Sequence, residues 1–474
     1  MKHIFKLLIF TYINFTDAFI ISKPIYIKNN NIRPTYLKRK LITSNLKNNE
    51  PISFKNNKIL FYGVESTPDI WVIISVYFVQ GIIGLSSLAI SFYYKDTLHI
   101  SPSELTFLSS ITVIPWIIKP FYGYISDFYP LFGYKRKYYL ILSGLISSIS
   151  LGSMSLLVSN NDITNAKWIA VSLLTLTSLG TAFSDVLIDA IVVSKSSNNL
   201  SGSLQSICWT ASSIGGLLSS YSSGILLDKY GSSWILCLTA SFPLITSCVG
   251  LYLKEEREEK EIVKVNKNIN LILKTFKNKS IIYPIIFLIL WQSTPSTGSS
   301  LFYFETNELG FKPEFFGQLS FVSSISSIFG IYLYNKYLKS VSLHKLFKWS
   351  CIYGFIFSLT PLILVTHFNR FIGLPDKLFA IGDDIILTIF SQIAFMPVLI
   401  LATEICPKGI EASLYALLMS INNLSGTIGS ILGGIAVNMA GITENNFDNL
   451  GSLIIITSLL GLLPLFFLNL LHKK

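Results

Sequence analysis

Charged residues are scarce in this sequence. Only 13% of the 474 residues are aspartate, glutamate, lysine or arginine, whereas 51% are hydrophobic. An average soluble domain has roughly twice that share of charged residues with which to cover its surface. The composition therefore excludes an ordinary soluble protein and indicates a membrane protein.

Residues that carry metal, redox or hydrolytic chemistry are also few. The five cysteines and five histidines stand apart from one another, and none belongs to a disulfide framework, a zinc pattern or an H-E-x-x-H motif. The nucleotide-binding pattern G-x-x-x-x-G-K-[ST] is absent, and no constellation of nucleophile and base is visible. We therefore expect no enzymatic activity, no metal site, no cofactor and no coupling to ATP.

Long apolar runs fill the chain from residue 68 onward. Many approach the length of about 20 residues that a helix needs to cross a membrane, and such runs favour helices over barrel strands. We predict an all-α membrane protein with spans at 70–93, 104–124, 138–158, 167–193, 201–226, 232–253, 280–303, 315–337, 343–366, 379–402, 411–438 and 450–471. Pro295 and Gly298 interrupt the seventh span, a discontinuity that often marks a binding site or hinge in transporters.

The positions of the basic residues predict the topology. The net charge is +11, but the lysines and arginines stand between the apolar runs, so they do not indicate a nucleic-acid partner. They concentrate in the even-numbered connections, which places these and both chain ends on the cytoplasmic or stromal side. The sequence thus divides into an N-terminal segment (1–67), a six-helix half (68–253), a charged cytoplasmic linker (254–279) and a second six-helix half (280–474).

The N-terminal segment has two interpretations. Lys2 and Lys6 precede a short apolar stretch, "LLIFTYINF", and residues 23–58 are rich in lysine and asparagine with Glu50 as their one acidic residue. This composition predicts disorder. It resembles the two-part leader that directs proteins to the relict plastid of apicomplexan parasites, and an uncleaved cytoplasmic tail is the alternative.

Three charged residues within the spans are costly enough to suggest function. A charge at mid-bilayer costs about 2.5–3.5 kcal/mol on insertion scales. Lys119 either reaches toward the headgroups or faces a central cavity, where it would attract an anionic substrate. Asp185 and Asp189 share one helix face, so either both have basic partners such as Lys119 and Lys195, or at least one carries a proton. The first possibility would make them structural ion pairs, and the second would make them proton-coupling residues.

Polar and aromatic residues within other spans are candidates for substrate binding. In the fifth span, Gln205 and Trp209 share a face and could supply a hydrogen bond and a stacking surface to a flat heterocycle. Trp291 in the seventh span and Asn422 and Asn423 in the eleventh also lie deep. The alternative is that these residues only pack helix against helix.

The loop between the second and third spans carries a recognisable motif. Gly123, Asp127 and the basic residues Lys135, Arg136 and Lys137 in "GYISDFYPLFGYKRK" resemble the Gly-x-x-x-Asp loop of the major facilitator superfamily. The insert "FYPLF" departs from its usual form. Together with "SDVLIDAIVV", "LFYFETNELGFKPEFFGQLSFVSS" and "ICPKGIEASLYALLMSINNLSGTIG", the stretch resembles the folate-biopterin transporter family, in an apicomplexan-like form, over residues 68–471.

The resemblance implies two six-helix halves that alternate access to a midplane site, and secondary-active, proton-coupled transport of folates or pterins. Lys119, Gln205 and Trp209 would bind substrate, Asp185 or Asp189 would hold the proton, and the loop described above would act as an inner gate. Carriers for another organic anion or an amino acid, and a non-transporting receptor, are the alternatives. The expected membrane is that of the plastid or the plasma membrane.

Overall fold

Helices make up nearly all of the described chain. The computed structural model describes residues 67–160, 166–195, 201–257, 279–405 and 411–471, which lie in one unit, Phe61–Lys474. Within these ranges the only β-pairing is an isolated bridge between Leu131 and Tyr134. The predicted all-α class is confirmed, whereas the predicted leader lies outside the described residues.

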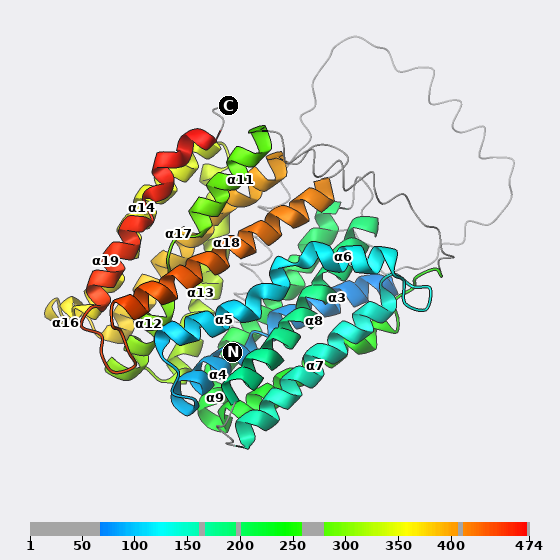
Figure 1. The fold of residues 1–474 in the computed structure, drawn as a ribbon, viewed down its shortest axis with the longest axis horizontal. Helices are drawn as coiled ribbons and strands as arrows, with labels where there is room; N and C mark the ends of the chain where they lie inside the picture. The colour runs from blue at the N-terminus through cyan, green and yellow to red at the C-terminus, as the bar shows by residue number, and fades with distance from the viewer. Residues whose placement is uncertain (1–66, 161–165, 196–200, 258–278, 406–410, 472–474) are drawn as a thin grey trace, which may run out of the picture. The chain divides into compact units, whose positions relative to one another are not determined.

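The helices of the N-terminal half coincide with the first six predicted spans. They are α3 (Pro68–Ile82), α4 (Leu85–Phe92), η2 (Tyr93–Thr97), α5 (Pro102–Ile117), α6 (Lys119–Phe128), α7 (Lys137–Ser159), α8 (Ala166–Lys195) and α9 (Ser201–Gly250) (Figure 1). The fifth and sixth spans both lie in α9 and meet at Gly231, whose φ is 78°. Glycine adopts this backbone conformation without a Cβ clash, so the chain reverses there with no connecting loop.

The C-terminal half has helices in the other six predicted ranges. They are α11 (Lys279–Gln292), α12 (Gly298–Tyr303), η3 (Phe304–Glu308), α13 (Pro313–Leu333), η4 (Tyr334–Leu338), α14 (Leu343–Ser358), α15 (Pro361–Val365), α16 (Phe368–Phe371), α17 (Asp376–Ile405), α18 (Glu411–Met439), α19 (Leu450–Leu460) and η5 (Leu463–Leu470). The seventh span is broken between α11 and α12, which confirms the interruption predicted from Pro295 and Gly298. Nine helical stretches of the described residues are long and apolar enough to cross a membrane.

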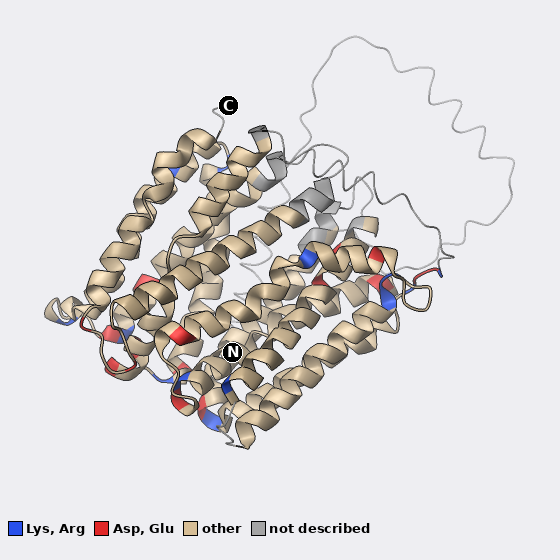
Figure 2. Cartoon of the chain, viewed as in Figure 1, with Lys and Arg blue, Asp and Glu red and all other residues tan. Residues whose placement is uncertain are grey.

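Charged side chains gather at the ends of these helices, and the middle of the bundle is almost free of them (Figure 2). This distribution is the one that a hydrocarbon core imposes, because an unpaired ion there is costly. We call the end of the bundle that bears the connections 98–101, 309–312 and 440–449 the outer end, because the connection 129–136 with its basic residues, which the sequence predicts to be cytoplasmic or stromal, lies at the opposite end.

The two halves pack against each other most closely toward the outer end. There α5 lies beside α18, and α9 beside α13 (Figure 1). Gly224 of α9 and Gly317 of α13 let the two backbones meet, and a Cβ added at Gly224 would collide with the carbonyl of Pro313. Small residues at such crossings allow membrane helices to approach closely.

A hydrophobic core shared by both halves seals this end. It combines Phe92 and Leu227 of the first half with Phe304, Phe311 and Phe316 of the second. At the opposite end, the cluster around Phe287 and Phe347 contains residues of the second half alone. Among the described residues, the shared core therefore closes the outer end of the bundle.

Candidate functional site

Lys119 and Asp185 form an ion pair inside the N-terminal half. The Lys119 Nζ lies 2.5 Å from an Asp185 carboxylate oxygen, and the two side chains are 17% and 12% exposed. Lys119 is the first residue of α6, and Asp185 lies in α8. The structure thus places Lys119 in the bundle interior, where a carboxylate balances its charge.

The indole ring of Trp116 packs over the ammonium group of Lys119. The Lys119 Nζ lies 4.4 Å from the centre of the Trp116 ring. A cation over an indole face is stabilised by about 0.5–2 kcal/mol, depending on how far it is desolvated. Trp116 is one of three tryptophans that lie deep in the predicted spans, but it was not among the binding residues predicted from the sequence.

Asp189 lies one helical turn beyond Asp185 but in a different environment. The buried Tyr77 of α3 donates its hydroxyl hydrogen to the Asp189 carboxylate. Asp185 is buried, whereas Asp189 is exposed. Among the side chains that the structure describes, no cation forms an ion pair with Asp189. The two carboxylates thus differ in their hydrogen-bonding partner and in their exposed fraction. Nothing in the sequence distinguishes Tyr77 from the other tyrosines in apolar spans.

The two predicted asparagines of α18 bind protein groups on different helices. Gln292, at the end of α11, donates from Nε2 to Asn422 Oδ1 at 2.9 Å. Asn423 donates from Nδ2 to the backbone carbonyl of Trp116 at 3.3 Å. The second bond joins the two halves at the level of the ion pair. Gln292 was not among the residues predicted from the sequence.

The remaining predicted binding residues are more dispersed. Trp209 is 68% exposed on α9, whereas Trp291 packs edge-on against Phe347 at 5.1 Å between ring centres, within the core of the second half. Gln205 falls within α9, but its side chain is outside the described residues. Trp209 therefore keeps a free ring face, and Trp291 is largely occupied by packing.

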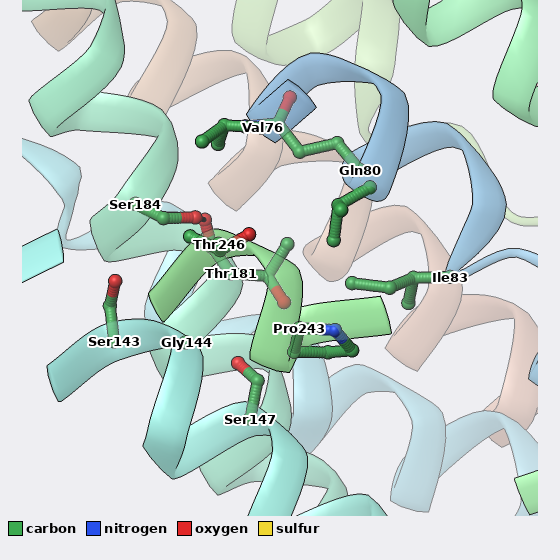
Figure 3. Close-up of a pocket in the computed structure, with 11 residues that line it drawn as sticks. Val76, Gln80, Ile83, Ser143, Gly144, Ser147, Thr181, Ser184, Pro243 and Thr246 are labelled. Carbon is green, nitrogen blue, oxygen red and sulfur yellow. Dashed lines mark hydrogen bonds between the residues drawn. The ribbon is translucent and has the colours of Figure 1, made fainter. Parts of the chain in front are cut away.

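A small cavity with both polar and apolar lining residues lies between α3, α7, α8 and α9 (Figure 3). Its volume is about 10 Å³, which is at most enough for one water molecule. Its lining includes Ser147, Thr181, Thr246 and Gln80, whose buried Nε2 has no hydrogen-bond partner among the residues that the structure describes. This cavity is too small for an organic substrate. Elsewhere in the described ranges, no group of three or more His, Cys, Asp or Glu side chains could hold a metal ion.

The predicted gating loop is organised by a residue that the sequence did not single out. Asp127 pairs with Arg136 at 3.2 Å. The backbone amides of Lys135, Arg136 and Lys137 all donate to the carboxylate of Glu255, at 2.9–3.2 Å. These amides lie at the start of α7, where a carboxylate is favoured by the unsatisfied N–H groups and the helix dipole.

The glycines of this loop differ in what they require. Gly133 follows the insert "FYPLF", has φ of 85°, and packs against the side chain of Arg257. Glycine is the residue that tolerates this conformation best. At Gly123, in contrast, an added Cβ would make only an ordinary contact with Val186, at 3.6 Å.

The outer end carries a polar contact between the halves. Lys95, only 8% exposed, lies 2.5 Å from Asp96 and donates to Asn307 of the second half at 2.8 Å. Asn307 in turn donates to the backbone carbonyl of Glu444 at 2.7 Å. This group was not predicted from the sequence, although a lysine next to an aspartate just beyond the first predicted span is visible there.

Comparisons with known proteins agree on one family. The BT1 family pattern matches residues 80–474. A "Folate-biopterin transporter" of Synechocystis is 43% identical over 423 residues, covering 88% of this chain and 84% of the relative. "Folate transporter 1" of Plasmodium falciparum is 32% identical, covering 83% and 77%. "Probable folate-biopterin transporter 2" of Arabidopsis thaliana is 34% identical, covering 85% and 82%.

Solved structures with the same arrangement are more distant in sequence. The nucleoside transporter NupG superposes with a TM-score of 0.65 at 16% identity, covering 86% of this chain and 100% of its own. A D-xylose–proton symporter gives a TM-score of 0.61 at 16% identity, covering 83% and 96%. At these identities the likeness shows the fold alone, which is the major facilitator arrangement predicted from the sequence.

Proposed function

The chain belongs to the BT1 family, and from that membership we propose that it is a secondary-active carrier that moves folates or pterins across a membrane. The observation that carries the proposal is the 43% identity to a relative named for these substrates, over 88% of the chain. The chain is a multi-pass membrane protein whose relatives and structural neighbours are transporters.

The ion pair offers a mechanism for recognising an anionic substrate. A folate carries carboxylates on a glutamate tail and a flat pterin ring. A substrate carboxylate would compete with Asp185 for Lys119, while the ring would find aromatic faces at Trp116 and Trp209. The amides of Asn422 and Asn423 stand on the facing half.

Asp189 is the carboxylate that we assign to proton coupling. Asp185 already has Lys119 as its counter-ion, whereas Asp189 is exposed and has the hydroxyl of Tyr77. Protonation of Asp189 removes a negative charge beside the Lys119–Asp185 pair. Proton entry would thereby be coupled to the step in which a substrate carboxylate replaces Asp185 as the partner of Lys119. In this assignment Asp189 carries the proton, and the Lys119–Asp185 ion pair can also stabilise the packing of α6 against α8.

Alternating access follows from how the halves meet. The shared core and the Lys95 contact close the outer end in this structure, and they must separate for the carrier to open outward. The loop containing Asp127 and Arg136 would then close the inner end.

Residues 1–67 would act as a leader to the plastid, or as a tail of a protein in the plasma membrane. Imaging a fusion of this segment distinguishes the two.

Uptake into proteoliposomes tests the proposal. Labelled folate, pterin and p-aminobenzoate are supplied with and without an imposed pH gradient. We expect saturable uptake of folate or pterin that the gradient increases, and Asp189→Asn should remove the increase. Asp228→Asn, at an exposed aspartate of α9 that the proposed mechanism does not use, is the matched control. Failure to take up any of the three compounds would reject the substrate assignment in favour of another organic anion or an amino acid.

A receptor or scaffold makes the opposite prediction for the same variants. It requires no uptake of any solute, and neutralising Asp185 or Asp189 would leave its binding activity intact. Gradient-independent uptake by both the parent and Asp189→Asn would keep the carrier but overturn the proton assignment.

A further inference from the structure

The second span is broken at the point where the ion pair stands. Helix α5 ends at Ile117 and α6 starts at Lys119, with Ile118 between them at φ −95° and ψ 18°. In a continuous helix, the N–H of residue 120 would donate to the carbonyl of Trp116. Residue 120 is a proline, which has no N–H and whose ring crowds that carbonyl. Pro120 therefore leaves the Trp116 carbonyl without its usual partner.

The missing donor comes from the other half of the protein. Asn423 of α18 donates from Nδ2 to the Trp116 carbonyl at 3.3 Å. A carbonyl within a membrane bundle is costly when it is unsatisfied, because no bulk water replaces the lost bond. The bond from Asn423 thus offsets a deficit that Pro120 creates.

Trp116 also touches the charge at the centre of the proposed site. Its ring lies 4.4 Å from the Lys119 Nζ, and Lys119 pairs with Asp185. Three contacts in series therefore run from α18 to α8 through one short break in the second span. A movement of α18 that withdraws Asn423 would leave the Trp116 carbonyl without a donor. The backbone that positions the Trp116 ring over the Lys119 ammonium would then change.

We propose that Asn423 is a positioning residue that couples the movement of the second half to the Lys119–Asp185 pair, through the Trp116 carbonyl that Pro120 leaves free. The bond exists when the outer end is closed, so it favours that state over the outward-open one. The coupling rests on the proposed carrier function, but the equilibrium between the two states is measured without a substrate.

A double-mutant cycle tests the proposal. Pro120→Ala supplies an N–H that can donate to Trp116 within the helix, so Asn423 should lose its importance in that background. Closure of the outer end is read from Ser299→Cys, in a chain without the five native cysteines, by labelling with a membrane-impermeant thiol reagent. Ser299 is partly buried and contacts Thr106 of the other half at 2.7 Å, so the labelling rate should rise when the halves part there.

We expect Asn423→Ala to raise the labelling rate roughly two- to tenfold, the equivalent of one typical hydrogen bond, and to change it less than twofold in the Pro120→Ala background. Asn423→Leu has nearly the same shape but no donor for the carbonyl, so it should raise labelling about as much as alanine. This variant keeps the test valid if alanine prevents folding. Asn422→Ala is the matched control, because its partner is Gln292, and its effect should be equal in both backgrounds.

Additive effects of Asn423→Ala and Pro120→Ala would overturn the proposal, as would wild-type labelling in Asn423→Leu. Neither outcome depends on which substrate is carried, so failure of the coupling is distinguishable from failure of the folate assignment. If labelling follows the prediction and no folate or pterin is taken up, the positioning role stands and the substrate assignment falls.

Discussion

Neutralising Asp185 should destabilise the protein far more than neutralising both members of its ion pair. In Asp185→Asn, the ammonium of Lys119 stays in a site where its side chain is 17% exposed, with no carboxylate to balance it. Breaking a buried pair by removing one partner costs about 3–5 kcal/mol, because an uncompensated charge remains. Because Lys119 is not fully buried, we expect Asp185→Asn to lose about 3 kcal/mol of unfolding free energy, the lower end of this range.

The double variant Lys119→Gln, Asp185→Asn removes the isolated charge. Replacing a whole buried pair by neutral groups is often close to neutral in free energy, so most of the loss, to within about 1 kcal/mol, should be recovered. Uptake should not recover, because the cation for a substrate carboxylate is gone. Stability and transport would thus separate in one variant.

The free energy of unfolding in mixed micelles, measured by titration with sodium dodecyl sulfate, gives the comparison. Asp127→Asn is the control, because its pair with Arg136 involves a carboxylate that is 51% exposed, and exposed pairs contribute about 0–1 kcal/mol. A double variant as unstable as Asp185→Asn would refute the argument from an unpaired charge. Equal losses in Asp127→Asn and Asp185→Asn would refute the argument from burial.

Three further predictions concern the ends of the bundle. Lys95→Ala removes the buried outer contact and should increase labelling of the outer end from outside by a thiol reagent. Gly224→Val places a side chain against the backbone of α13 and should trap the outward-open state, with uptake lost, whereas Gly216→Ala should be tolerated since nothing lies within 4 Å of an added Cβ there. Glu255→Ala removes the acceptor of three amides at the start of α7 and should cost about 1–2 kcal/mol of unfolding free energy, against little change for the exposed Glu256→Ala.

Each of these has an outcome that would contradict it. Unchanged outer labelling in Lys95→Ala would mean that the shared hydrophobic core alone closes that end. Normal uptake by Gly224→Val would show that the close crossing of α9 and α13 is not needed for the cycle. An equal stability of the two glutamate variants would show that solvent replaces Glu255 at the helix start.

The candidate site was predicted in part. Lys119, Asp185 and Asp189 stood out because each is expensive in an apolar run, and the structure brings Lys119 and Asp185 together. Asn423 stood out as a polar residue, but its acceptor is a backbone carbonyl, which no sequence pattern distinguishes from any other. Tyr77 and Gln292 carry no unusual cost, so they could be found only through their partners.

The sequence by itself determined the all-α membrane class, the ranges in which helices form, the break in the seventh span and the family. These follow from the length of apolar runs, from charge and from proline and glycine, which act locally along the chain. The tertiary structure alone decided that Lys119 meets Asp185, 66 positions away, that Asp189 takes a hydroxyl, and that α18 satisfies the carbonyl left free by Pro120. A residue's cost in lipid is a property of its type, whereas the partner that offsets this cost depends on how distant helices pack and rotate.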